Sequence, residues 1–598
     1  MAITWANILN WESGSLESIA KDLLEASQGL REAYEDGEDA LSAVQSEGEA
    51  VTAMRATTLT NLASLERALT NVNGALMAIE GARDGVATVV ANVHSLLAYA
   101  SAVECTILTN GTVIDQSSSR PVDTPSPGYL DVVDKIKEIV EQANQVDRNL
   151  CEALSNINND RYTDGDGADN KVVGVPDFPQ PNWTPSQNAA WWKSLSYEQQ
   201  QFLINRRPDD IRHLDGLPAV ARDKANHHAL HGYLHADGKY RQGALKDAEE
   251  EAIEAQKEFD KAPLDGKRHL AKERLDRATE ALEDLIAIDS QTDNMTRRRK
   301  GLPPAYLLDF DYDKKYQRTT AIVSSGNPDT ATHVSTLVPG IGTNVRGDLG
   351  YYMEFNERLR KQTAYAGIDP NNVATISYLG YVAPKNSIPD GGIIQASDIG
   401  YANRAAPKLA QFEEGLRASA EANNHNFVNT LIGHSYGSTT SGKSMTLVAP
   451  GTVDRFIMCG SPGSGVQSID EYNVPKEHVY VSSIPTHDSV QDLNLLASSG
   501  YGKDPRNLDG ITHLSGDATD SADYWVNKKI PGISRWWTDV THSFEHHMDY
   551  FDEGTRTSQD FANIVAGTDQ TTDKEWEMLD KAHELGLTEN WSVSRNQA

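Results

Sequence analysis

The second half of the chain alternates short β-rich runs with stretches that are compatible with helices. From about Leu302 onward, the runs lie at residues 320–323, 333–338, 373–378, 427–432, 455–460 and 478–482. Alternation of this kind predicts an α/β fold, with a mainly parallel sheet and helices on both of its faces. Reactive side chains in such folds lie at the carboxyl ends of the strands, so the chemistry of this chain is expected there.

A short glycine-flanked motif, Gly433-His434-Ser435-Tyr436-Gly437, lies directly after the run at 427–432 and directly before a helix-compatible stretch. A serine at a sharp strand-to-helix turn takes a strained backbone conformation, so the two glycine positions must stay small. The turn lifts the Ser435 hydroxyl out of the sheet and places the Tyr436 backbone N–H behind a developing oxyanion. The motif therefore predicts that Ser435 is a nucleophile; the alternative is a structural turn serine.

An oxyanion hole needs a second N–H donor, which usually comes from the loop after the third strand. The sequence V-P-G-I-G-T-N at residues 338–344 follows the run at 333–338 and suits this role. Its glycines let the backbone approach a substrate, and the N–H of Ile341 or Gly342 is the expected donor. The alternative is an ordinary glycine turn.

The acid of such a triad follows the serine in sequence, and the histidine comes last. Asp488 follows the last β-rich run and is the predicted acid, with Asp504 as the alternative. His547, in a histidine-rich segment near the end of the chain, is the predicted base, with His546 as the alternative. A metal site in this segment is a competing interpretation, but serine chemistry accounts for a histidine without one. No metal or organic cofactor is expected.

Residues 1–115 are predicted to be helical. The best evidence is an apolar stripe with spacings of 3 and 4, formed by Leu62, Leu65, Leu69, Val72, Leu76 and Ile79. An amphipathic helix is also expected from about Ser15 to Leu30, and a small apolar segment lies at 86–97. The stripe must be buried, either in an intramolecular bundle or in an elongated helical hairpin that pairs with another protein.

The middle of the chain is expected to link these two regions. A Ser- and Pro-rich linker at 117–127 precedes a further helix, and two highly charged helical runs at 243–288 surround a turn and predict an exposed hairpin. The predicted domains are residues 1–115 (helical hairpin or bundle), 116–300 (helical linker region) and 301–598 (catalytic domain).

Composition excludes several classes of function. The chain has 54 Lys and Arg against 86 Asp and Glu, a net charge of −32, so it would repel nucleic acids and anionic lipid surfaces. Its three cysteines are far apart in sequence, which argues against a disulfide framework. The N-terminal sequence does not resemble an ordinary signal peptide, and no unbroken apolar run is long enough to predict a membrane span.

The motifs together resemble an α/β-hydrolase family of poorly defined function that is common in actinobacteria. The resemblance covers residues of about 187–567, and it rests on T-A-T-H-V at 330–334, V-P-G-I-G-T-N at 338–344, G-H-S-Y-G-S at 433–438, G-S-P-G-S-G at 460–465 and H-M-D-Y-F at 547–551. It implies an α/β-hydrolase fold with Ser435, Asp488 and His547 as the triad. The chain departs from the family at Met548, because the family histidine is usually followed by serine.

Members of this family often carry an N-terminal helical hairpin similar to the Trp-x-Gly substrates of type VII secretion. Trp11 and the predicted helices fit loosely, but Ser46 stands where the turn tryptophan would be. A Tyr-x-x-x-Glu string at Tyr34 to Glu38 precedes the turn, whereas an export signal of this kind usually follows the hairpin. The chain is thus expected either in the cytoplasm or outside the cell by a type VII-like route.

Two functions follow from these observations. The first is a serine hydrolase that cleaves a small-molecule or lipid ester through an acyl-enzyme intermediate. The second is a secreted interaction protein, in which residues 1–115 bind a helical partner or the secretion machinery and the hydrolase is cargo or degenerate.

Overall fold

The computed structural model describes residues 3–43, 49–116, 126–158, 178–264, 266–385, 398–484, 499–516, 550–552 and 554–571. The chain forms two compact units. The first, the helical unit, consists of Met1–Leu203, Leu214–Leu217 and Glu414–Asn423. The second, the sheet unit, consists of Ile204–His213, Pro218–Glu413 and Asn424–Ala598. The predicted linker region of residues 116–300 contributes to both units.

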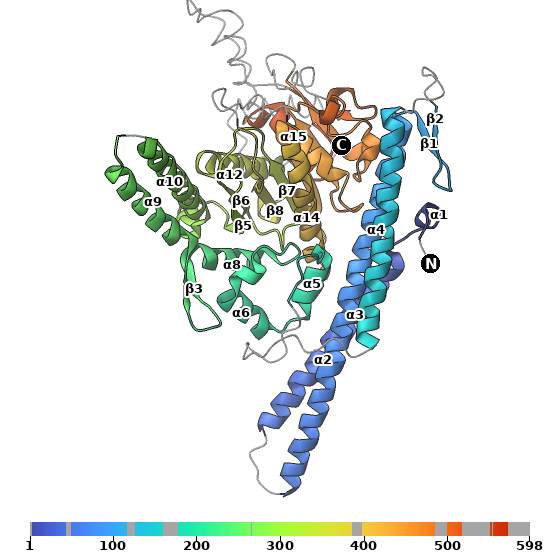
Figure 1. The fold of residues 1–598 in the computed structure, drawn as a ribbon, viewed down its shortest axis with the longest axis vertical. Helices are drawn as coiled ribbons and strands as arrows, with labels where there is room; N and C mark the ends of the chain where they lie inside the picture. Colours follow the sequence, from blue (N-terminus) through green and yellow to red (C-terminus); the bar gives the residue numbers. More distant parts are fainter. Residues whose placement is uncertain are drawn as a thin grey trace, which may run out of the picture. The chain divides into compact units, whose positions relative to one another are not determined.

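The helical unit is built around one long helix, α3, against which α2 and α4 pack (Figure 1). Its elements are α1 (Trp5–Ile8), α2 (Gly14–Ala43), α3 (Glu49–Ala102), β1 (Cys105–Ile107), β2 (Val113–Asp115), α4 (Pro127–Asn158), α5 (Pro185–Ser194) and most of α6 (Tyr197–Arg206). The apolar stripe at 62–79 and the segment at 86–97, which the sequence suggested were separate, belong to this single helix α3. Gly85 permits α3 and α4 to pack closely, because an added Cβ would lie 2.5 Å from the Val146 side chain of α4.

The core of the helical unit joins the start of the chain to α3 and α4. Trp5 and Ile8 of α1 are buried in one cluster with Val89 and Val93 of α3 and Val132 of α4. These contacts support the interpretation of an intramolecular bundle for this part of α3. The expected pairing with another protein and the likeness to type VII substrates stay predictions, and Ser46 lies outside the described residues.

One helix among the described residues is long and apolar enough to cross a membrane by length and composition alone. It is the part of α3 at residues 68–102, whose mean hydropathy over the best window is 1.3. The same part of α3 supplies Val89, Val93 and Leu96 to the buried cluster with α1 and α4. The core helix of a bundle has this composition as well, so the observation does not distinguish a membrane span from a packed helix.

Glu80 is a buried carboxyl group in the helical unit. Its side chain lies 3.1 Å from the Arg83 guanidinium, and Asp84 and Glu421 add negative charge nearby. The pKa of Glu80 is raised from 4.5 to about 7, chiefly by burial; Arg83 lowers it, and Asp84 and Glu421 raise it. The folded protein therefore holds a proton on Glu80 between pH 4.5 and about pH 7, whereas the unfolded chain releases it.

This difference predicts that the stability of the helical unit falls as the pH rises through that window. The loss is on the order of 3 kcal/mol, because each pKa unit corresponds to about 1.4 kcal/mol. The variant Glu80→Gln is expected to unfold at a higher temperature than the wild type at pH 8, and at a similar temperature at pH 4.5. Thermal unfolding at both pH values measures this, with the exposed Glu25→Gln as the control. An unchanged pH dependence in Glu80→Gln would contradict the prediction.

The sheet unit contains an eight-stranded sheet. Its strands are β5 (Ala305–Asp313), β6 (Arg318–Ser325), β7 (His333–Val338), β8 (Val373–Leu379), β9 (Val428–His434), β10 (Arg455–Cys459), β11 (Val479–Ser482) and β12 (Thr512–His513). They lie in the order β12-β11-β10-β9-β7-β8-β6-β5. All neighbouring strands from β12 to β8 are parallel, and β6 alone runs against the others because it is antiparallel to both β8 and β5.

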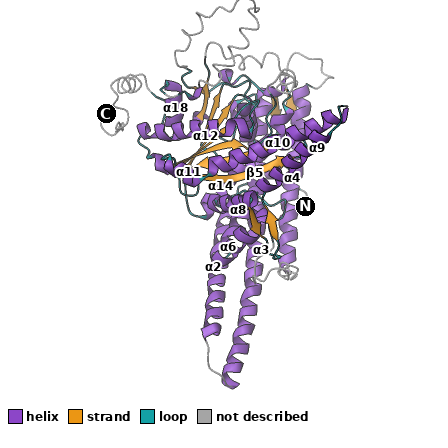
Figure 2. Ribbon diagram, turned by 90° about the vertical axis from the view of Figure 1, so that its left-hand side faces the viewer, coloured by secondary structure: helices purple, strands orange, loops and turns teal. Residues whose placement is uncertain are grey.

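Helices cover both faces of this sheet (Figures 1 and 2). The helices of the sheet unit are α7 (Pro208–Ile211), α8 (Ala219–His231), α9 (Ala244–Lys261), α10 (Gly266–Thr292), α11 (Asn294–Arg299), α12 (Val345–Gln362), α14 (Gly400–Ala422), α15 (Tyr436–Met445) and α18 (Arg556–Val565). Adjacent residues of β8 show the two faces. Ser377 accepts a hydrogen bond from Asn356 of α12, whereas Tyr378 packs on Phe412 of α14. Successive side chains of a strand point to opposite faces, so α12 and α14 lie on opposite sides.

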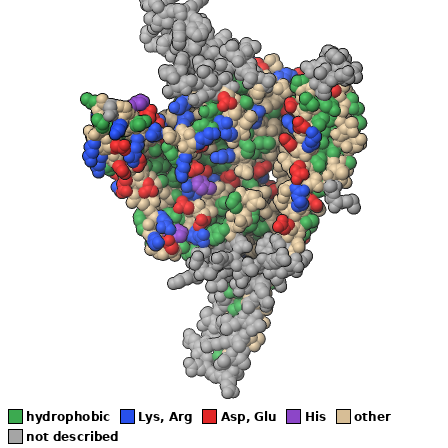
Figure 3. Space-filling view, viewed as in Figure 1, with side chains coloured by type: hydrophobic (Ala, Val, Ile, Leu, Met, Phe, Trp, Pro, Cys, Tyr) green, Lys and Arg blue, Asp and Glu red, His purple; other side chains and the backbone are tan. Residues whose placement is uncertain are grey.

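Short elements complete the unit. A small hairpin pairs β3 (Gly232–Leu234) with β4 (Tyr240–Gln242). The 3₁₀ helices are η2 (Thr363–Ala366), η3 (Pro370–Asn372), η4 (Ile469–Glu471), η5 (Lys476–His478), η7 (Ser499–Tyr501) and η8 (Pro505–Asn507). The charged hairpin predicted at 243–288 is present as α9 and α10, and acidic and basic side chains are mixed on its surface (Figure 3).

The predicted fold class is confirmed: a mainly parallel sheet with helices on both faces, together with an N-terminal helical region. Each predicted β-rich run corresponds to a strand of the sheet. The edge strand β5 was missed, although its sequence A-Y-L-L-D-F-D-Y-D is rich in aromatic residues. Acidic residues interrupt it at Asp309 and Asp311, and they mask the β-propensity of the segment.

Candidate active site

Ser435 lies at a sharp turn between β9 and α15. β9 ends at His434 and α15 begins at Tyr436, so the strand–turn–helix context that the motif requires is present. The backbone of Ser435 has φ 58° and ψ −135°, a conformation that side-chain-bearing residues rarely adopt. The Ser435 N–H donates to the Cys459 carbonyl at 2.9 Å, which fixes the turn to β10. This strain is the feature that sequence reasoning expected of a nucleophile elbow.

The two glycines of the motif are required by close packing. A Cβ added to Gly433 would lie 2.5 Å from the Cα of Ser438, in the first turn of α15. One added to Gly437 would lie 2.3 Å from the Val338 carbonyl oxygen, at the end of β7. Any larger residue at either position would push α15 away from the sheet and move Ser435 with it.

The predicted oxyanion loop faces the serine directly. A Cβ added to Gly340 would lie 2.3 Å from the Cβ of Ser435 and 2.5 Å from its Oγ. Ser435 is 2% exposed, and its Oγ has no hydrogen-bond partner within the part of the chain that the structure describes. The hydroxyl group and the backbone of Gly340 are thus in contact, as an attacking oxygen and an oxyanion hole must be.

The two predicted donors of this loop differ in availability. The Gly342 N–H donates to the Pro384 carbonyl at 2.7 Å, so it is already engaged. The N–H groups of Ile341 and Tyr436 have no acceptor among the described residues. Of the three N–H groups that the sequence suggested, two therefore have no acceptor in the described part of the chain and can donate to an oxygen that develops negative charge.

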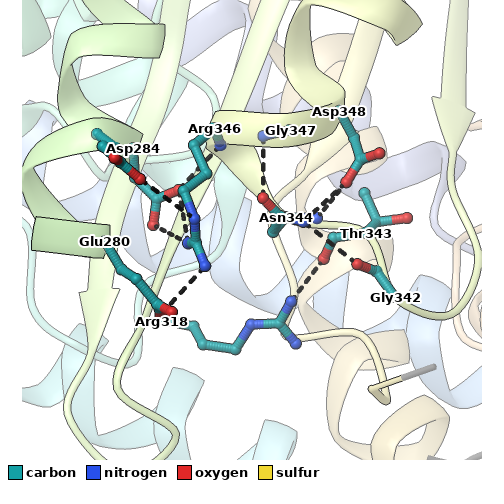
Figure 4. A network of polar contacts seen from close by, with 10 residues as sticks. Glu280, Asp284, Arg318, Gly342, Thr343, Asn344, Arg346, Gly347 and Asp348 are labelled. Carbon is teal, nitrogen blue, oxygen red and sulfur yellow. Dashed lines mark hydrogen bonds and ion pairs between the residues drawn. The ribbon is translucent and has the colours of Figure 1, made fainter. Parts of the chain in front are cut away.

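A polar network holds this loop in place (Figure 4). Arg318 of β6 donates from Nη2 to the Thr343 carbonyl and from Nη1 to the Ala383 carbonyl, both at 2.8 Å. Asn344 caps α12, because its Oδ1 accepts the Gly347 N–H at 2.9 Å. Burial lowers the pKa of Arg318. Arg318 is a positioning residue that sequence reasoning missed, because only the fold brings β6 beside the loop after β7.

Arg346, also in Figure 4, ties the start of α12 to α10. Its guanidinium lies 3.3 Å from Asp284 and 3.1 Å from Glu280. Burial raises the pKa of Asp284, and the hydrogen bonds and charge of Arg346 oppose this effect. The base of the charged hairpin thus supports the loop that faces Ser435.

Asp504, the alternative acid, has a structural role in the described residues. Its carboxylate caps η8 by accepting the Arg506 N–H at 2.9 Å. It also accepts hydrogen bonds from Arg506 Nε at 3.0 Å and Nη2 at 2.8 Å. These bonds occupy both carboxylate oxygens. Asp488, the preferred acid, lies outside the described residues.

His546 and His547 also lie outside the described residues, but the described residues just before the predicted acid and just after the predicted base meet near Ser435. The Ile484 N–H, just after β11, donates to the hydroxyl group of Tyr550 at 3.0 Å. Phe551 packs edge-to-face on His434 with ring centroids 5.0 Å apart. His434 directly precedes Ser435, so the residues that flank Asp488 and His547 meet beside the nucleophile.

A small cluster of apolar side chains borders the elbow. Tyr436, Ala402 and Tyr501 are buried, and Ile341, Ile399 and Tyr401 pack on them as half-buried residues. The Tyr436 hydroxyl group donates to the Asp398 carbonyl at 2.6 Å and accepts the Ala402 N–H at 3.1 Å. Burial raises the pKa of Tyr436. The first residues of α14 are therefore attached to the first residue of α15.

Within the described ranges, no group of three or more His, Cys, Asp and Glu side chains is arranged to hold a metal ion. The histidine-rich segment 541–549 lies outside these ranges. The arrangement around Ser435 can support nucleophilic attack on a carbonyl group with two backbone donors for the oxyanion.

Comparison with known proteins agrees with this geometry. Residues 314–498 match a family model described as alpha/beta hydrolase, a range that includes the loop at 338–344, Ser435 and Asp488. The chain is also similar to two uncharacterized proteins of Mycobacterium tuberculosis, Rv2079 of strain H37Rv and MT2140 of strain CDC 1551. Each is 27% identical over 427 residues, which cover 69% of this chain and 60% of the relative.

The chain thus spans less than two thirds of the length of these relatives. No solved structure matches it significantly. The family match and the strand order together identify the fold as that of the α/β hydrolases. The chain therefore contains an alpha/beta hydrolase domain with Ser435 at its strand-to-helix turn.

Proposed function

We propose that the protein is a serine hydrolase that cleaves carboxylic esters. The observation that carries this proposal is the strained turn at Ser435, whose hydroxyl group contacts the backbone of Gly340. Strain of this kind costs folding free energy and persists at functional sites, where it aims a side chain at a substrate. A structural turn serine would have no need of a second glycine loop packed against its Oγ.

In the proposed reaction, Ser435 Oγ attacks the ester carbonyl carbon while His547 accepts the hydroxyl proton. The N–H groups of Tyr436 and Ile341 stabilise the oxyanion that forms. The alcohol leaves with the proton from His547, and the acyl group stays on Ser435. A water molecule, deprotonated by the same histidine, then releases the acid. Asp488 orients the imidazole and stabilises its charged form.

Chain length supports the assignment of acid and base. Asp488 is four residues beyond Ile484, and His547 is three residues before Tyr550. Segments of that length span at most roughly 10 to 14 Å, at about 3.5 Å per residue. Because Ile484 and Tyr550 are hydrogen-bonded to each other beside His434, these chain lengths allow both side chains to reach Ser435. We prefer esters to peptides because α/β-hydrolase folds host ester chemistry most often, which is an analogy at the level of the fold.

A fluorophosphonate probe tests the proposal, because it forms a covalent bond only with an activated serine. The wild type is expected to be labelled, and peptide mapping should place the label on Ser435. Ser435→Ala should lose the label, whereas Ser444→Ala, which removes a buried serine from the same helix, should keep it. A folded wild-type protein that stays unlabelled would refute the proposal. A panel of esters of increasing chain length then identifies the substrate.

A further inference from the structure

Two cations beside the apolar cluster converge on one aromatic ring. Lys315 Nζ lies 5.0 Å from the ring centroid of Tyr316, and the Arg404 guanidinium carbon lies 5.6 Å from the same centroid. Arg404 also lies 4.8 Å from the ring centroid of Tyr401, and the two tyrosine rings are 5.6 Å apart. Lys315 and Arg404 are exposed, and both tyrosines are half-buried. We call these four residues the cationic tyrosine pair.

Neither cation forms an ion pair with a carboxylate among the described residues. Two acids close to them in sequence, Asp398 and Asp313, accept hydrogen bonds from backbone groups. Asp398 accepts the Gly400 N–H at 2.8 Å, and Asp313 accepts the Lys315 N–H at 2.9 Å. In a chain with a net charge of −32, two neighbouring cations without acidic partners are unexpected.

The surroundings add further positive charge. Arg318 interacts electrostatically with Tyr401, and its guanidinium donates to the carbonyl oxygens of Thr343 and Ala383 rather than to a carboxylate. Basic side chains also gather in Figure 3 over the region where α12 and β6 lie in Figure 1. These basic groups add positive charge locally to a protein that is strongly negative as a whole, although Asp284 and Glu280 also act on Arg318.

The cationic tyrosine pair is continuous with the candidate active site. Tyr401 belongs to the apolar cluster that contains Tyr436 and Ile341, which carry the two free N–H groups. The charge of Arg404 acts on the hydroxyl group of Tyr436, where it lowers the pKa against the larger effects of burial and of the Asp398 carboxylate, which raise it. Half-buried Ile341 and Ile399 thus lie in the same cluster as Tyr401, whose ring Arg404 contacts.

We propose that Lys315 and Arg404 bind a negatively charged group of the ester substrate, while Ile341, Ile399 and Tyr401 contact its hydrocarbon part. This inference rests on the proposed function. A guanidinium group binds carboxylates and phosphates through two parallel hydrogen bonds, and stacking on tyrosine rings holds its plane in place. The preferred substrate is therefore an anionic ester, such as the ester of a dicarboxylic acid or an ester that carries a phosphate group.

A matched pair of substrates tests this specificity. We expect the wild type to have a lower KM for 4-nitrophenyl hydrogen succinate, which is anionic, than for neutral 4-nitrophenyl butanoate. Arg404→Gln should raise the KM of the anionic ester about tenfold, with kcat nearly unchanged, because it removes a charge-assisted contact made before and during the reaction. It should leave the neutral ester unaffected, and Arg404→Lys should restore part of the loss. The preference should also weaken in about 0.5 M salt.

Arg298→Gln is the matched control, because Arg298 is an exposed arginine of α11 in the same unit. The proposal is overturned if Arg404→Gln affects both esters equally, or if Arg298→Gln produces the same change. A Lys315→Gln variant should show a smaller effect in the same direction, since a flexible ammonium group makes a single-point contact.

A binding experiment separates this proposal from the proposed function. Ser435→Ala is titrated by calorimetry with octyl phosphate, with octanoate and with neutral octyl glucoside. Binding of either anion that Arg404→Gln weakens about tenfold supports the anionic subsite even if the fluorophosphonate never labels Ser435. Whichever of octyl phosphate and octanoate binds with the lower Kd shows whether the subsite prefers a phosphate or a carboxylate group. Binding that Arg404→Gln leaves unchanged, or equal binding of all three ligands, overturns the subsite even if Ser435 is labelled.

Discussion

Replacing Gly340 with alanine is expected to remove nearly all hydrolytic activity while the protein still folds. The added Cβ would lie 2.3 Å from the Cβ of Ser435 and 2.5 Å from its Oγ, far closer than atoms in contact can approach. Either the loop or the serine must move by about 1 Å or more. A displacement of that size at a reacting atom costs roughly 100-fold in rate. The loop is held by Arg318, so the serine cannot keep its position by displacing the loop alone.

The measurement is kcat/KM with an ester that the wild type hydrolyses, together with the rate of fluorophosphonate labelling. Gly266→Ala is the control, because a Cβ at Gly266 would meet nothing within 4 Å and the residue has no positive φ. Thermal unfolding shows whether the Gly340→Ala protein remains folded. Wild-type activity in a folded Gly340→Ala protein would mean that this loop does not face the reacting serine.

His547→Ala is expected to lower kcat by about three to four orders of magnitude, because the serine loses the group that accepts its proton. His546→Ala should change kcat by less than about tenfold, since a neighbouring imidazole that is not the base only affects local packing. Measuring both variants on the same ester, with circular dichroism to check folding, decides between the two histidines. The opposite ranking would assign the base to His546.

The same comparison applies to the acid. Asp488→Asn should lower kcat by a similar factor, because an amide neither orients the imidazole correctly nor stabilises its positively charged form. Asp504→Asn should act on stability instead, since Asp504 caps η8 and pairs with Arg506. The loss of such a cap typically costs about 1 kcal/mol. A large fall in kcat for Asp504→Asn, without a change in unfolding temperature, would reverse the assignment.

The sequence predicted the class of fold because strand and helix patterns are local. The runs at 333–338 and 373–378 coincide with β7 and the first six residues of β8, and the turn at Ser435 lies where the glycine motif placed it. Strand β5 escaped prediction because its acidic residues hide an otherwise β-prone segment. Helix α3 was divided in two because small residues near Gly81 and Gly85 weaken the apolar stripe, whereas the structure uses them to let α4 and α5 approach.

The candidate site was less accessible to sequence reasoning, because its geometry depends on contacts between distant segments. Ile341 and Gly342 looked equivalent as donors, and only the bond from Gly342 to Pro384 separates them. The roles of Arg318 and Arg404 also have no local signal. Arg318 lies on β6, which reaches the loop after β7 only in the folded chain. Arg404 lies on α14, which likewise reaches the start of α15 only through folding.

The contact between the C-terminal segment and the serine turn has a consequence for when the protein becomes active during its synthesis. Phe551 packs on His434, and the Tyr550 hydroxyl group accepts a hydrogen bond from Ile484 just after β11. Both residues leave the ribosome more than 100 residues after Ser435. At the usual pace of translation, roughly 5 to 20 residues per second, the elbow is exposed for several seconds before these residues emerge. If the proposed function holds, the nascent chain thus carries its nucleophile without a finished site, and we expect hydrolysis only when almost the entire sheet unit has been made.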